Sequence, residues 1–140
     1  MVVTNDIGNT GTVHPQNKLD VGKRLARWAF AKNYGHEDVT YSGPLYKSMK
    51  IEGNRVRILF AYDHDGLKSR DGKPLTWFTI AGADRRFTPA KANIDGNTVL
   101  VWNDTVKQPV AVRFAWHQIA EPNLMNAEGL PASAFRTDRW

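Results

Sequence analysis

The sequence predicts an α+β protein in which a strand–loop–helix unit, residues 1–35, precedes an antiparallel β-sandwich. Apolar residues recur with helical spacing between residues 17 and 33. From residue 48 onward, short runs rich in β-branched and aromatic residues are separated by turn signals. Because no further helical pattern separates these runs, they favour antiparallel strands over a parallel βαβ sheet.

The first 35 residues should form one strand, one loop and one helix. Residues 1–4 have the composition of a short strand, and residues 5–15 contain the glycines and the proline of a loop. Asn17 can cap the following helix, with Asp20 at its third position, and Gly35 can end it. The apolar face of this helix is expected to contain Val21, Leu25, Trp28 and Ala29. A strand exposes unpaired backbone groups on both edges, so this unit must complete a larger α/β sheet or dock on the sandwich.

The rest of the chain is predicted to be a connector, the sandwich and a tail. Two hairpins should turn at Gly53–Asn54 and at Asp95–Gly96, and two further strands are expected over Leu75–Ala81 and Val110–Trp116. The last twenty residues have little periodicity and read as an ordered but irregular tail. The expected boundaries are residues 36–47 for the connector, 48–120 for the sandwich and 121–140 for the tail.

Composition excludes several classes of protein. The chain has 140 residues, a net charge of +5 and no cysteine, which rules out disulfides and thiolate metal sites. It contains no apolar run long enough for a transmembrane helix, and we expect no membrane partner. Much of the positive charge lies on the predicted helix, where a solvated face explains it better than nucleic-acid binding does. Residues 1–20 lack the order of a secretory signal. The location stays open: periplasmic or secreted if the full-length protein carries a signal peptide.

His14 is the first candidate for chemistry. It lies between the predicted strand and helix, at the edge of a sheet where active sites of open α/β folds are found. Pro15 restricts the backbone of His14, and Asn17 fixes the start of the helix. These features would hold an imidazole in one place, as a general base requires. The alternative is a surface-loop histidine without a catalytic task.

Several stretches of the chain, in order and with compatible spacing, resemble the C-terminal portion of the sialate O-acetylesterase family of SGNH/GDSL-type carbohydrate esterases. The most specific are "VHPQNK…VGKRLA" around His14 and "GLPASAFRTD" in the tail. Others are "YSGPLYKSMKIEGNRVRI", "FTIAGADRRFTPAKANIDGNTV" and "PVAVRFAW". The resemblance implies that residues 1–35 are the end of an SGNH α/β hydrolase domain. It also implies removal of acetyl groups from sugar hydroxyls, on sialic acid or on plant polysaccharides.

In such enzymes a serine attacks the acetyl carbonyl and a histidine takes its proton, and His14 matches that histidine. The acid that orients it is less clear, because Gly11 and Thr12 stand where relatives have aspartate. Asp6 is the nearest acid on the N-terminal side and could orient His14. It could equally cap the loop through its own backbone, leaving a backbone carbonyl as the orienting group.

The nucleophile is the main departure from the family pattern. No Gly-Asp-Ser or Gly-x-Ser-x-Gly block occurs, and no serine follows a strand in a tight turn that opens a helix. The four serines are Ser42, Ser48, Ser69 and Ser133. The resemblance therefore implies a further N-terminal hydrolase segment that carries the serine, and we expect this chain alone to be inactive.

Substrate contacts and cofactors complete the predictions. Trp116, at the end of a predicted strand, is our first choice for contact with an acetylated carbohydrate. "YDHDG" at residues 62–66 invites a metal site, but neighbouring side chains on an extended chain point apart, so we expect no metal and no other cofactor. The alternative function is a non-catalytic β-sandwich module that binds carbohydrate or packs against a partner.

Overall fold

The computed structural model describes residues 1–9, 11, 12, 14 and 16–140. One helix near the N-terminus is followed by ten short strands in three antiparallel sheets, so the described part of the chain is mainly β. The elements are α1 (Lys18–Lys32), β1 (Leu45–Glu52), β2 (Arg55–Ala61), β3 (Leu67–Ser69), β4 (Phe78–Ala81), β5 (Thr88–Pro89), β6 (Lys91–Asp95), β7 (Thr98–Trp102), β8 (Ala111–Phe114), β9 (Leu124–Asn126) and β10 (Phe135–Arg136).

The ends of α1 are those that the sequence predicts. The Asn17 side chain accepts from the backbone N–H of Asp20 at 3.1 Å and donates to the Asp20 carboxylate at 2.8 Å, which caps the first turn. Gly35, with φ of +73°, ends the helix in the left-handed conformation that glycine adopts without strain. In the described residues, no helix is long and apolar enough to span a lipid bilayer.

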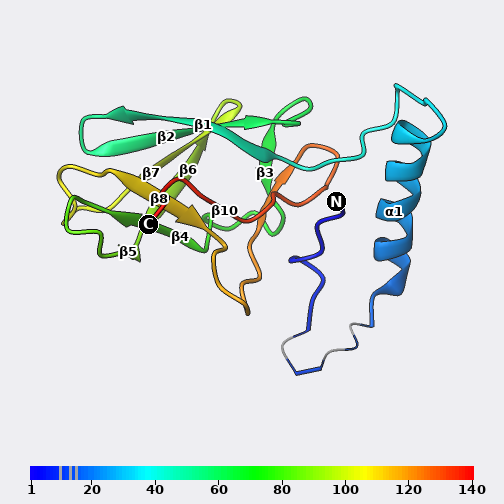
Figure 1. Ribbon diagram of the computed structural model, residues 1–140, viewed down its shortest axis with the longest axis horizontal. Coiled ribbons are helices and arrows are strands. Elements are labelled where there is room, and N and C mark those ends of the chain that lie inside the picture. The colour runs from blue at the N-terminus through cyan, green and yellow to red at the C-terminus, as the bar shows by residue number, and fades with distance from the viewer. Residues whose placement is uncertain (10, 13, 15) are drawn as a thin grey trace.

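Two four-stranded sheets form the sandwich, with strand orders β1-β2-β7-β6 and β10-β8-β4-β5. A third sheet, β3-β9, closes the end that is nearer to α1 (Figure 1). The predicted hairpins are confirmed, because Glu52 pairs with Arg55 across Gly53–Asn54 and Asp95 pairs with Thr98. β4 begins at Phe78 and β8 ends at Phe114, so both strands are shorter than predicted.

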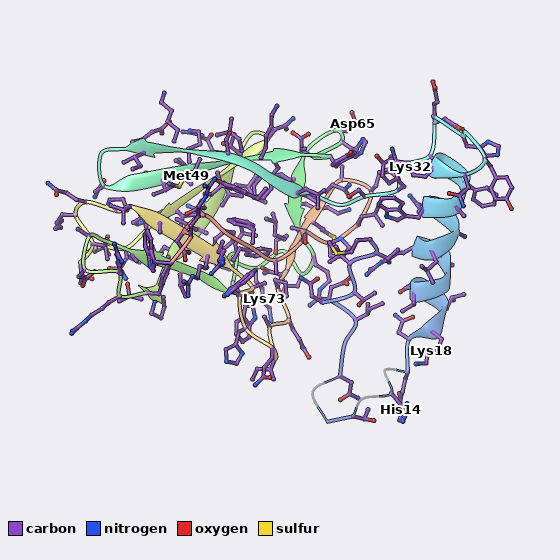
Figure 2. All side chains as sticks on the ribbon, viewed as in Figure 1. His14, Lys18, Lys32, Met49, Asp65 and Lys73 are labelled. Atoms are coloured by element: carbon purple, nitrogen blue, oxygen red, sulfur yellow. The ribbon has the colours of Figure 1, made fainter. Side chains whose placement is uncertain are left out.

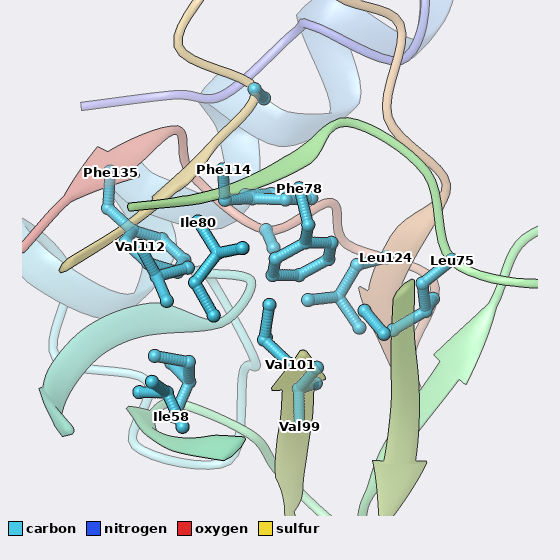
Figure 3. Packing of buried hydrophobic residues seen from close by; sticks show 14 of the residues in the cluster. Ile58, Leu75, Phe78, Ile80, Val99, Val101, Val112, Phe114, Leu124 and Phe135 are labelled. Carbon is cyan, nitrogen blue, oxygen red and sulfur yellow. The ribbon is translucent and has the colours of Figure 1, made fainter. Parts of the chain in front are cut away.

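The core fills the space between the two large sheets. Side chains that alternate along β2 and β7 meet those of β4 and β8 (Figure 3). Its fully buried members include Val56, Ile58, Ile80, Val99, Val101, Val112, Phe114 and Leu124. Aromatic stacking extends the core to the tail, since the ring of Phe135 on β10 lies 5.6 Å from that of Phe114 and 4.9 Å from that of Tyr46.

Residues 1–4 are not a strand, and that prediction is wrong. They run as an extended segment beside α1, and the carbonyl oxygen of Val3 accepts from Nη1 of Arg24 at 2.8 Å instead of from a neighbouring strand. We call residues 1–9 the N-terminal strap. Figure 1 shows the strap, in dark blue, between the sandwich and α1. A composition that favours extended backbone does not by itself produce a strand, because a strand also needs hydrogen-bond partners for its backbone groups.

The tail is more regular than the sequence indicates. It supplies β9 and β10, and its Asn126 is fully buried between the connector and the sandwich. The Asn126 amide donates to the carbonyl of Ser42 at 3.2 Å and accepts from the backbone N–H of Leu130 at 2.9 Å. The tail is therefore ordered by these hydrogen bonds and not by a regular apolar pattern, because a buried amide must be hydrogen-bonded in any local structure.

Gly43 lies where the connector crosses the tail, and any side chain there would meet backbone. A Cβ at this position would lie 2.1 Å from the carbonyl oxygen of Pro131. We therefore expect Gly43→Ala to lower the free energy of unfolding by at least about 1–3 kcal/mol. Urea unfolding followed by tryptophan fluorescence measures this. The matched control is Gly22→Ala in the open middle of α1, where nothing lies within 4 Å. This control should keep or raise helix stability, and equal stability losses in the two variants would contradict the prediction.

Candidate functional site

His14 lies on the loop between the N-terminal strap and α1. Its side chain is exposed, and its backbone N–H donates to Oγ1 of Thr12 at 3.1 Å. Figure 2 shows His14 at the far end of this loop, beside the start of α1. The imidazole is thus neither buried in the sandwich core nor covered by the helix, and it is free to meet a group from outside. Pro15, which was expected to restrict it, lies outside the described residues.

Asp6 faces the helix. Its two carboxylate oxygens accept from Nη1 and Nη2 of Arg24, each at 2.7 Å, in a bidentate pair. Both side chains are buried, with 5% of Asp6 and 10% of Arg24 exposed. The structure therefore brings Asp6 to Arg24 and not to His14. Sequence reasoning missed this pair because it treated Arg24 as one of several solvated charges on the helix.

The strap is also fastened to the sandwich. The carbonyl oxygen of Asp6 accepts from Nη1 of Arg70, which follows β3, at 2.5 Å. The Asn5 amide donates to the carbonyl oxygen of Ala132 in the tail at 3.2 Å. Residues that are far apart in the sequence thus hold the base of the His14 loop from two sides.

A cleft of about 830 Å³ separates the strap from the loop at residues 115–121. Gly8, Asn9, Gly11 and Thr12 line one wall, so the cleft borders the loop that carries His14. The opposite wall consists mainly of His117, Gln118, Ile119, Ala120 and Glu121. The volume lies within the range of about 300–1,000 Å³ that is typical of small-molecule sites.

Trp116 lies at the start of the 115–121 loop and is 52% exposed. The guanidinium of Arg136 sits over its ring, 5.4 Å from the ring centre. The side chain is exposed but does not line the cleft, and its contact with a carbohydrate stays a prediction.

Trp77, within the strand predicted over residues 75–81, is a second exposed aromatic residue. It is 40% exposed, and its ring stacks on that of His117 with the ring centres 6.0 Å apart. Trp77 and Ala115 both have positive φ, +64° and +50°, and the Ala115 N–H donates to the Trp77 carbonyl at 2.9 Å. For non-glycine residues this conformation is strained. The alternation along the strand predicted over residues 75–81 could not reveal it, because β4 begins only at Phe78 and Trp77 lies outside it.

Beside Trp77 lies a second hollow of about 500 Å³, whose shape depends on Asn123. This buried amide donates to Asp71 at 3.0 Å, and its oxygen accepts from the backbone N–H of Thr76 at 3.0 Å. Asp71 also accepts from the Ser69 hydroxyl at 2.8 Å and from the backbone N–H of Lys73. Donation by Asn123, then by Ser69 and Lys73, lowers the pKa of Asp71 to about 2.

The four serines show no catalytic arrangement with a histidine. Ser42 and Ser133 donate to neighbouring backbone carbonyls, and Ser69 donates to Asp71. Ser48 lies exposed on β1. Among the described residues, no serine hydroxyl is hydrogen-bonded to an imidazole, and no group of three or more His, Asp or Glu side chains is placed to hold a metal ion.

Comparisons with known proteins agree with the family that the sequence resembles. The chain is 28% identical to the sialate O-acetylesterase of Mus musculus over 109 residues, and 28% identical to that of Rattus norvegicus over 112 residues. Each match covers 76% of this chain and 20% of the rodent protein. No family model matches the chain.

A solved structure is more similar. The crystal structure of a carbohydrate acetylesterase from Xanthomonas citri superposes with a TM-score of 0.94 at 44% sequence identity. The match covers 99% of this chain and 32% of that protein. The comparisons confirm the resemblance to these esterases. The chain spans about a third of the bacterial enzyme and a fifth of the rodent enzymes.

Loss of the Asp6 carboxylate should release α1 from the strap. Breaking a buried ion pair by removing one partner typically costs about 3–5 kcal/mol, since the other charge is left uncompensated. We expect Asp6→Ala to increase hydrogen exchange of the α1 amides and to lower the unfolding free energy. The control Asp38→Ala removes an exposed acid and should change neither measurement. Combining Asp6→Leu with Arg24→Met should restore much of the lost stability; a double variant as unstable as Asp6→Ala would argue against the ion pair as the cause.

The Asp71 network predicts a pH dependence. The pKa of Asp71 is about 2 in the folded protein and about 3.9 in an unfolded chain. Its contribution to stability is therefore complete above pH 4 and disappears as the pH falls toward 2. Urea unfolding at pH 5, 4, 3 and 2 should show a steeper loss for the wild-type protein than for Asp71→Asn, which cannot titrate. Parallel curves for the two proteins would be inconsistent with this assignment.

Proposed function

We propose that this chain is the histidine-bearing C-terminal part of a carbohydrate O-acetylesterase. The observation that carries the proposal is the 44% identity to a carbohydrate acetylesterase over 99% of the chain. The exposed His14 on a loop that borders a cleft is consistent with it. The substrate would be an O-acetylated sugar, as in the relatives that this chain resembles.

In this proposal His14 is the general base. A serine hydroxyl attacks the acetyl carbonyl, and the His14 imidazole takes its proton and then returns it to the departing sugar hydroxyl. Water hydrolyses the acetyl-enzyme by the same proton transfers in reverse. The serine would come from a segment outside this chain, because none of the four serines is paired with a histidine and the relatives are about three to four times as long.

We assign Asp6 a supporting part in the same site. Its carboxylate and carbonyl hold the base of the His14 loop between Arg24 and Arg70. The group that fixes the tautomer of His14 would then be a backbone carbonyl or a residue of the segment that brings the serine. Trp116 is proposed to contact the sugar, since it is exposed beside the cleft.

The second candidate is a non-catalytic carbohydrate-binding module. It is favoured by the exposed aromatic side chains Trp77 and Trp116, which could bind sugar without any nucleophile. The two candidates differ in whether His14 matters to turnover.

The test joins this chain to the part of the Xanthomonas citri enzyme that it does not match, and measures hydrolysis of 4-nitrophenyl acetate. His14→Ala should lower kcat roughly 10⁴-fold or more, as loss of a triad member does. His36→Ala removes another exposed histidine, at the end of α1, and should have no effect. An unchanged kcat in His14→Ala would remove His14 from the site.

The chain by itself should not hydrolyse 4-nitrophenyl acetate above the rate of free imidazole. Imidazole without a positioned serine and oxyanion donors lacks most of the catalytic power of a triad. Turnover by the isolated chain that disappears in His14→Ala would show that its own serines suffice, and so contradict the need for another segment.

A further inference from the structure

We infer that Trp77, His117 and Ile119 form a binding surface for an uncharged stretch of a glycan chain; this deepens the proposed function and rests on it. The three residues form a ridge with a hollow on each side. The larger hollow borders the His14 loop and is lined by His117 and Ile119. The smaller one is lined by Trp77 and Ile119.

The presentation of Trp77 requires strained backbone. β4 begins at Phe78, so Trp77 stands at the strand end, opposite Ala115 at the end of β8. Both have positive φ, which costs of order 1–3 kcal/mol at a non-glycine residue. The two left-handed residues are held together by the bond from the Ala115 N–H to the Trp77 carbonyl. Strain of this kind persists where the surrounding structure enforces it, and it is concentrated at binding sites.

The chemistry of the ridge suits sugar rings. The indole of Trp77 is 40% exposed, and its ring stacks with the imidazole of His117. One face of a pyranose is made of C–H groups and packs on an aromatic ring, while its hydroxyls need polar partners at the edge. Such partners lie in both hollows, among them Asn9 and Gln118 in the larger one and Lys73 in the smaller one.

Charge indicates that the bound sugars are neutral. The larger hollow has no lysine or arginine among its described lining residues and contains the carboxylate of Glu121. In the smaller hollow Arg70 and Lys73 are balanced by Asp71 and Glu121. A sugar carboxylate would meet Glu121 in the larger hollow without a compensating cation, which is unfavourable.

The paired hollows indicate a chain of sugars rather than one. Ile119 and Glu121 line both hollows, so the hollows adjoin across the loop at residues 117–121. A glycan that crosses this ridge would place one unit near the His14 loop and another on Trp77. A single sugar would fill only one hollow and would leave the Trp77 face uncovered.

Calorimetric titration of the 140-residue chain with acetylated glucomannan oligosaccharides of about six units tests the inference, with sialyllactose as the acidic probe. We expect binding of the neutral oligosaccharide and weaker or no binding of sialyllactose. Trp77→Asn should weaken the former at least tenfold, about 1.4 kcal/mol. Asparagine is chosen because it tolerates positive φ.

Controls separate binding from folding and from catalysis. Ile119→Asp changes an exposed loop residue and should weaken binding without changing the unfolding curve. Tyr34→Ala removes an exposed aromatic residue just after α1, which lines neither hollow, and should bind like wild type. No binding of the neutral oligosaccharide, tighter binding of sialyllactose, or full binding in both Trp77→Asn and Ile119→Asp would overturn the inference. Hydrolysis that depends on His14 without glycan binding would overturn this inference alone, and glycan binding with hydrolysis independent of His14 would overturn only the esterase proposal.

Discussion

The bidentate pair between Asp6 and Arg24 is the interaction on which the arrangement of the site depends. Its two side chains are nearly inaccessible to water, although the other residues of the helix and the strap are half-buried or exposed. A buried guanidinium and carboxylate must satisfy each other, because either alone would be a costly uncompensated charge. The same Asp6 binds Arg70 through its carbonyl, so one residue joins helix, strap and sandwich. The His14 loop begins and ends at elements that this junction holds.

A second set of contacts fixes α1 at its C-terminal end. The ring of Tyr41 lies 4.9 Å from that of Trp28 and 5.5 Å from that of Tyr62, and the ammonium of Lys32 lies 4.6 Å from its centre. Donation by Lys32, followed by donation from Tyr62, lowers the pKa of Tyr41. The helix is therefore anchored at its middle by Arg24 and at its end by aromatic stacking, while its outward face, including Leu25 and Phe30, stays exposed. Two separated points of attachment prevent α1 from rotating against the sandwich, whereas a single point of attachment would allow it.

What the sequence predicted well is local. The helix cap at Asn17, the glycine stop and both hairpin turns depend on residues within a few positions of one another, and all were found where expected. The errors involve partners that are distant in the sequence. Leu25 was placed on the buried face, but Arg24 occupies it because Asp6 lies there. The tail looked irregular because its order comes from the bonds of Asn126 to the connector. For the site, His14 and Trp116 were singled out from the sequence, whereas Trp77 was not, since its exposure follows from a φ value that no pattern encodes.

The cleft is built from both parts of the chain, and this limits how independent the parts can be. One wall belongs to the strap and the other to the loop after β8, whose start is fixed by the hydrogen bond between Ala115 and Trp77. Arg70 reaches the strap from the segment after β3, and Asn123, in the same sheet region, supports the backbone just before Trp77. The hydrogen bond from Arg70 that holds the strap therefore lies close to the hydrogen bonds of Asn123 that support Trp77. A displacement of the strap would widen the cleft between the proposed base and the proposed sugar-binding surface, so the sandwich acts as the second wall of the site and not as an appended module.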